Sequence, residues 1–128
     1  MVARRAPPRD RPRAPTAYDI AADGSLSNRR VWADGLAPDG ICLDADGCIW
    51  THAAEMQECV RVREGGEVLD RIKLDRSLFA TMLGGPDRRT LFMLVAEWSG
   101  TGGVNDAITR RTGQVLIGDA PAPGAGWP

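Results

Sequence analysis

The chain has 128 residues, a length that predicts a single domain. Its 16 basic and 17 acidic residues nearly cancel, so the overall charge indicates neither a nucleic-acid partner nor an anionic membrane surface. No apolar run approaches the ~18–20 residues that a membrane-spanning helix needs, and we expect no membrane partner.

Residues 1–16 combine prolines with arginines, and we expect them to form a disordered tail. Proline lacks a backbone N–H group and the arginines repel one another, so no packed element is predicted there. A binding arm for nucleic acid or another partner is the less favoured interpretation. The regular part of the chain is therefore expected over residues 17–128.

After this tail, short apolar stretches alternate with turns, and no stretch has a helical period. We therefore expect an all-β chain. The predicted strands are 18–21, 29–33, 41–43, 48–50, 58–63, 67–74, 79–83, 90–96 and 114–117.

Two of these strands predict how the sheets are covered. Residues 58–63 alternate, with Val60 and Val62 on one face and Arg61 and Arg63 on the other. Residues 91–95 are apolar on both faces, as in a strand that is covered above and below. In residues 67–74, we expect Val68, Ile72 and Leu74 to share a face.

The chain is organised around a hairpin at residues 38–50. Asp46-Gly47 is a strong turn signal, because glycine reaches positive φ without a Cβ clash and aspartate bonds its own backbone. Turn chemistry accounts for Asp44 and Asp46. In front of the hairpin, Pro38-Asp39-Gly40 places a carboxylate at the start of a strand, and Asp39 is its one candidate for chemistry.

Three cysteines, Cys42, Cys48 and Cys59, lack metal-ligand spacing. We interpret them as small buried residues in a reducing compartment, and a cytoplasmic location follows. A Cys42–Cys48 disulfide across the hairpin is conceivable, although nothing in the sequence requires it.

Turns and aromatic anchors repeat with a spacing of 42 residues, from Trp50 to Phe92 and from Gly24 to Gly66. A repeat of this length with four short strands is typical of a β-propeller blade. One full blade is predicted over residues 39–74. The chain then holds about two and a half blades, whereas a propeller closes with about four to eight, so we expect two uncovered blade faces.

The hairpin at residues 38–50 resembles the corresponding hairpin of the gluconolactonase, regucalcin and luciferin-regenerating enzyme family. The stretches at residues 22–32, 63–70, 83–92 and 111–128 are similar to segments of bacterial members. The resemblance covers residues 17–128 and implies the C-terminal part of a six-bladed β-propeller that hydrolyses sugar lactones.

The same resemblance implies one divalent metal ion, Ca²⁺ or Zn²⁺, with Mg²⁺ or Mn²⁺ as further alternatives, at the top of the central channel. Of the three metal ligands in the family, only the aspartate has a matching position here, Asp39. By resemblance, Asp39 would be both the metal ligand and the catalytic residue that orients or deprotonates the attacking water.

Two functions stay open. The first is a metal-dependent sugar-lactone hydrolase that needs a missing N-terminal half or self-association, so that the isolated chain is inactive. The second is a non-catalytic propeller fragment that acts as a binding or assembly module. His52 is expected to be a packed histidine rather than a ligand, and Glu97 and Trp98 could line a channel rim.

Overall fold

A computed structural model describes residues 14–36, 38–100 and 103–126 of the chain. The prediction of a disordered tail falls mostly on residues outside this part and stays a prediction. Within it, the first strand begins at Thr16.

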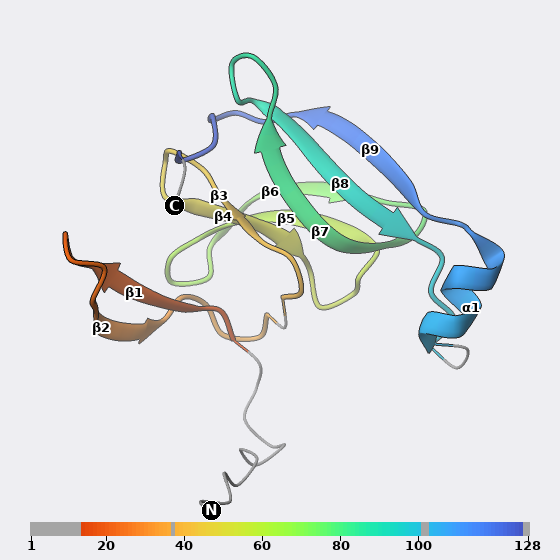
Figure 1. The fold of residues 1–128 in the computed structure, drawn as a ribbon, viewed down its shortest axis with the longest axis horizontal. Helices are drawn as coiled ribbons and strands as arrows, with labels where there is room; N and C mark the ends of the chain where they lie inside the picture. The colour runs from red at the N-terminus through yellow and green to blue at the C-terminus, as the bar shows by residue number, and fades with distance from the viewer. Residues whose placement is uncertain (1–13, 37, 101–102, 127–128) are drawn as a thin grey trace, which may run out of the picture.

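Three antiparallel sheets make up the fold, arranged as part of a β-propeller (Figure 1). A hairpin pairs β1 (Thr16–Ile20) with β2 (Leu26–Val31). The central sheet contains β3 (Cys42–Leu43), β4 (Cys48–His52), β5 (Glu58–Arg63) and β6 (Val68–Lys73) in that order. The third sheet contains β7 (Ser77–Gly84), β8 (Thr90–Ala96) and β9 (Gln114–Asp119).

The central sheet is the blade that the 42-residue spacing predicts. Its β3–β4 turn forms as expected, with Gly47 at φ 74° and its N–H donating to the carbonyl of Asp44. Each strand pairs with its neighbour in sequence, which is the simplest connection for antiparallel strands.

The main core lies between the central sheet and the third sheet. Trp50 is almost fully buried and anchors it from β4, while Leu78 and Leu91 close it from β7 and β8. Burying large side chains of this kind stabilises the fold by about 1.5–3 kcal/mol each. The two sheets are therefore held as one unit.

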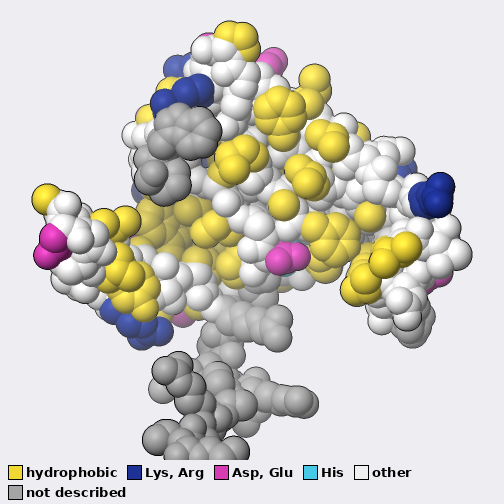
Figure 2. Space-filling model, in the orientation of Figure 1, with side chains coloured by type: hydrophobic (Ala, Val, Ile, Leu, Met, Phe, Trp, Pro, Cys, Tyr) yellow, Lys and Arg dark blue, Asp and Glu magenta, His cyan; other side chains and the backbone are white. Residues whose placement is uncertain are grey.

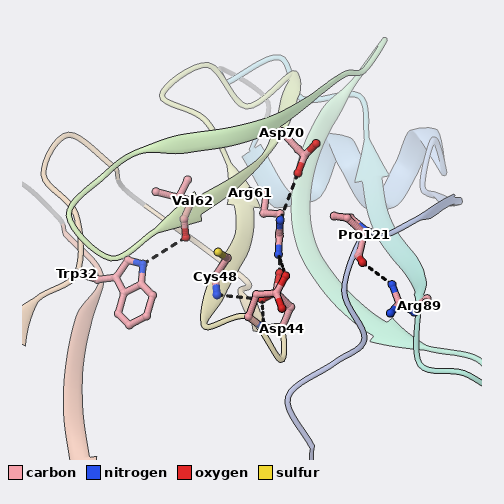
Figure 3. Close-up of polar contacts among 9 residues, drawn as sticks. Trp32, Asp44, Cys48, Arg61, Val62, Asp70, Arg89 and Pro121 are labelled. Atoms are coloured by element: carbon pink, nitrogen blue, oxygen red, sulfur yellow. Dashed lines mark hydrogen bonds and ion pairs between the residues drawn. The ribbon is translucent and has the colours of Figure 1, made fainter.

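A second core covers the opposite face of the central sheet. Ile49, Val60 and Val62 pack there against Ala33, in the segment that follows the β1–β2 hairpin. The indole Nε1 of Trp32 donates to the carbonyl of Val62 at 3.5 Å (Figure 3). The alternation of residues 58–63 thus correctly placed the valines on one face.

The third sheet buries only one face. The outward face carries exposed apolar side chains from all three strands: Met82, Leu94, Val115 and Ile117. Figure 2 shows apolar side chains exposed over this region of the surface. The prediction that residues 91–95 are covered on both faces is wrong for this chain, because no described element packs on the outward face.

Two further expectations are corrected. A helix, α1 (Gly103–Arg110), lies between β8 and β9, where the sequence analysis predicted none. Val68 and Ile72 do not share a face as predicted: Val68 packs against the second core and Ile72 against the main core. The reason is a register irregularity between Arg61 and Val62, which reverses the faces of β6 at that point. None of the helices in the described residues has the length and apolar character to cross a membrane.

Candidate functional site

Asp39 lies just before β3, at the end of the sheets where several loops meet. The register of β4–β5 places the loop of residues 53–57 at this end, and Leu78 donates its N–H to the Met56 carbonyl at 2.7 Å. Asp39 is exposed. Among the described residues its carboxylate has no hydrogen bond or ion pair, so it is free to bind a ligand.

The backbone that carries Asp39 is fixed to the neighbouring sheet. The N–H of Gly40 donates to the carbonyl of Phe79 in β7 at 2.8 Å. A Cβ atom on Gly40 would lie 2.6 Å from the Cβ of Ala80, closer than real Cβ contacts come. Glycine is therefore required at residue 40 for the chain to approach β7 this closely.

Asp44 and Asp46 belong to the framework rather than to the candidate site. Asp44 is almost fully buried, and its Oδ1 accepts hydrogen bonds from the N–H groups of Asp46 and Cys48. This agrees with the turn chemistry predicted for Asp44, whereas the side chain of Asp46 pairs with Arg61 instead of the turn backbone.

Arg61 completes this buried polar cluster (Figure 3). Its Nε donates to Asp44 Oδ2 at 2.7 Å, and its Nη2 donates to Asp46 at 2.8 Å. Burial alone would lower the pKa of the guanidinium, but these hydrogen bonds outweigh it and raise the pKa. The alternation of residues 58–63 places Arg61 on the face opposite the valines but does not indicate its burial, because its partner, Asp44, lies 17 residues away in the sequence.

His52 is buried at the end of β4, as a packed histidine should be. Its Nδ1 contacts the carbonyl of Ala53 at 2.6 Å. Trp98 follows β8 and meets the ring of Phe79 edge to face, with centroids 5.6 Å apart. Glu97 pairs with Arg110 of α1, so neither residue is shown to line a channel.

All three cysteines are buried and unpaired, so the conceivable Cys42–Cys48 disulfide is absent. Burial raises the pKa of each thiol, and for Cys59 the pKa rises to about 12. These groups are neutral at physiological pH and are poor nucleophiles or metal ligands.

The described residues do not by themselves form a complete metal site. They contain no group of three or more His, Cys, Asp or Glu side chains placed to hold an ion. One exposed carboxylate holds Ca²⁺ or Mg²⁺ weakly, because Ca²⁺ takes about six to eight oxygen ligands and Mg²⁺ takes about six. A metal site at Asp39 would therefore need further ligands from outside the described residues.

A hollow of about 550 Å³ borders the central sheet. It has an apolar floor that includes Val60 and Val68, and its rim carries Glu58 and Arg71, which form an ion pair. Asp39 does not line it. The hollow borders the second core, since Leu36, Ala53, Val60 and Val68 belong to both.

Comparison with known proteins gives a consistent result. The model of the SMP-30/Gluconolactonase/LRE-like region matches residues 11–97. Over 83 residues the chain is 32% identical to a 6-deoxy-6-sulfogluconolactonase from Pseudomonas putida, covering 59% of this chain and 28% of that protein. Over 122 residues it is 30% identical to regucalcin from Xenopus laevis, covering 85% of this chain and 40% of that protein.

Solved structures agree on the fold. A luciferin-regenerating enzyme superposes with a TM-score of 0.64 at 22% identity, covering 89% of this chain and 41% of that one. A calcium-binding protein, regucalcin from Agrobacterium tumefaciens, superposes with a TM-score of 0.63 at 15% identity, covering 91% and 41%. The chain thus spans less than half the length of each of these proteins.

Proposed function

Because the chain belongs to the SMP-30/gluconolactonase/LRE-like family, we propose that it acts as part of a metal-dependent sugar-lactone hydrolase. The observation that carries this proposal is Asp39: an exposed carboxylate without a structural partner, on a backbone fixed to β7. The relative named a sulfogluconolactonase supports a sugar lactone as the substrate class.

In this proposal Asp39 has two roles. It supplies one oxygen ligand to a divalent ion, and it orients the attacking water or accepts its proton. The metal, when bound, would stabilise negative charge on the lactone oxygen. The solved relative described as calcium-binding supports a divalent cation, with Ca²⁺ first, then Zn²⁺, Mg²⁺ and Mn²⁺.

The proposal includes a partner that supplies the remaining ligands. It is either a polypeptide with the missing N-terminal blades or a second copy of this chain. The exposed apolar side chains on β7–β9 support such a partner, because a blade is stable when a neighbour covers each face. We also propose that the protein works in the cytoplasm, an interpretation that its three unpaired cysteines support.

A second candidate function is a non-catalytic binding or assembly module. The same exposed apolar face favours it, since docking alone would use that face without Asp39. The two candidates differ in whether the Asp39 carboxylate is needed.

The experiment measures hydrolysis of D-glucono-1,5-lactone with Ca²⁺, Zn²⁺, Mg²⁺ or Mn²⁺. The chain is assayed alone and mixed with the N-terminal segment of Xenopus laevis regucalcin that precedes the aligned region. We expect no metal-dependent turnover from the chain alone and turnover in the mixture. Asp39→Asn should reduce that turnover by about a hundredfold or more, the size of effect typical for a positioned general base.

Asp34→Asn is the matched control, because Asp34 is an exposed aspartate in the same inter-sheet segment. It should leave turnover unchanged. Equal turnover by the Asp39→Asn mixture would contradict the hydrolase proposal. A stable but inactive mixture would favour the binding module instead.

A further inference from the structure

We infer that Phe79 and Ala80 of β7 are positioning residues for Asp39, and that they act through Gly40. The inference rests on the proposed role of Asp39, and it names the part of the neighbouring sheet that holds this carboxylate in place. Neither residue touches a substrate in this account, so both act on chemistry only through the position of the Asp39 backbone.

The first observation is a bulge in β7. Leu78 pairs with Val95 and Ala80 pairs with Leu94, so Phe79 has no partner in β8. Bulges of this kind re-aim groups out of the regular ladder and are over-represented near active sites. Here the carbonyl of Phe79 accepts the Gly40 N–H at 2.8 Å, which joins the two sheets directly beside Asp39.

The second observation is the closeness of the two backbones. A Cβ on Gly40 would lie 2.6 Å from the Ala80 Cβ, 2.7 Å from the Ala80 Cα and 3.0 Å from the Phe79 carbonyl oxygen. Two of these atoms belong to the backbone, so rotation of a side chain does not relieve the clash. A small residue at position 80 and glycine at position 40 are both required.

The third observation is that β7 is fixed on both sides of the bulge. The Leu78 N–H donates to the Met56 carbonyl at 2.7 Å, and the Thr81 hydroxyl donates to the Trp50 carbonyl at 2.9 Å. The Phe79 carbonyl therefore sits on a rigid support. Such support matters because a displacement of about 1 Å at a catalytic group can reduce a rate by about a hundredfold.

The side chain of Asp39 is not held by polar contacts of its own. Its exposed side chain makes no polar contact within the described residues, so its position depends on the backbone on either side. One peptide bond separates it from Gly40, and the Gly40–Phe79 hydrogen bond is the nearest tie to a sheet. Loss of this tie should move or loosen the carboxylate while the two cores stay intact.

The test uses the full chain, isotopically labelled, with the exchange of each amide followed by NMR. Mn²⁺ is added separately as a probe, because it broadens signals near the carboxylate that binds it. We expect a protected Gly40 amide and selective broadening at Asp39 and Gly40. Ala80→Val should speed Gly40 exchange about tenfold, as loss of one hydrogen bond can, and weaken the Mn²⁺ effect.

Three further variants separate positioning from general damage. Ala96 is a half-buried alanine in β8, so Ala96→Val makes the same change at a matched position and should leave the Gly40 amide protected. Ala80→Gly keeps the close approach and should behave as the unchanged chain. Gly40→Ala should behave as Ala80→Val, and adding Ala80→Gly to it should not restore protection, because the Ala80 Cα stays in the way.

Unchanged Gly40 exchange and unchanged Mn²⁺ broadening in both Ala80→Val and Gly40→Ala would overturn the inference. An equal loss of Gly40 amide protection in Ala96→Val would also overturn it, since the effect would then not be specific to residue 80. The Gly40 amide could be protected in the unchanged chain and lose that protection in Ala80→Val and Gly40→Ala, while Mn²⁺ never broadens the Asp39 signal. In that case the metal role in the proposed function fails, but the Gly40–Phe79 hydrogen bond is confirmed. The two failures are therefore distinguishable.

Discussion

The central sheet and the third sheet differ in how much of each is covered. In β4 all five residues, Cys48–His52, are buried, because one core lies on each face of the central sheet. In β8 buried residues alternate with less buried ones, although Leu91–Val95 are all apolar. Figure 2 shows the outward face of the third sheet as part of the surface.

This difference teaches that an apolar strand is not a buried strand. β8 is the more apolar of the two strands, since β4 includes Thr51 and His52, but only β4 has a core on both sides. An exposed apolar face of this kind marks an interaction surface or an aggregation risk. The predictions below test the contrast between covered and uncovered positions.

The largest expected effect comes from the charges buried in the central sheet. Asp44→Ala should lower the free energy of unfolding by about 3–5 kcal/mol, because it leaves Arg61 buried without its closest partner. Urea denaturation measures this. Asp46→Ala removes a hydrogen bond to the same guanidinium from a mostly exposed carboxylate, and it should cost about 1 kcal/mol or less. Equal losses would show that burial of Asp44 is not what matters.

The second prediction compares the two faces of β8. Leu91→Ala should lower the free energy of unfolding by about 2–5 kcal/mol, because Leu91 fills the main core. Leu94→Ala should change it by only about 0.5 kcal/mol, because Leu94 is on the outward face. The same denaturation experiment checks both. If a partner covers the outward face, Leu94→Ala should become costly only in its presence.

The smallest effect concerns the interface that both sheets share. Cys59 lies there, and burial raises the pKa of its thiol from 9.0 to about 12. The folded state favours the neutral thiol. The thiol therefore makes its full contribution to the stability of the fold below about pH 9, and this contribution is lost as the pH rises towards about 12. Between about pH 9 and pH 12, ionisation of this thiol should lower the free energy of unfolding by at most about 1.4 kcal/mol per pH unit.

Unfolding free energies at several alkaline pH values test this. Cys59→Ala should have a shallower slope than the unchanged chain, whatever its stability at neutral pH. In the folded chain the thiols should also resist alkylation at pH 8. Rapid alkylation of Cys59, or an unchanged slope, would show that the thiol is not held in the core.

Most strands could be predicted because their signals are local. The bounds of β5 and β8 agree with the predicted stretches 58–63 and 90–96, since alternation and flanking turns define both. The hairpin turn followed from Asp46-Gly47, because the backbone preference of glycine needs no distant contact. Helix α1 was missed although Val104, Ala107 and Ile108 have helical spacing, because those eight residues were interpreted as a loop.

The sequence by itself determined the blade pattern, the turn chemistry and the position of Asp39 before a strand. Only the tertiary structure decided that Arg61 is buried beside Asp44, that Gly40 meets the bulge at Phe79, and which face of β8 is uncovered. The physical reason is distance along the chain. Backbone preferences and alternation act between near neighbours, whereas these contacts join residues 17 to 39 positions apart and leave no periodic signal in either segment.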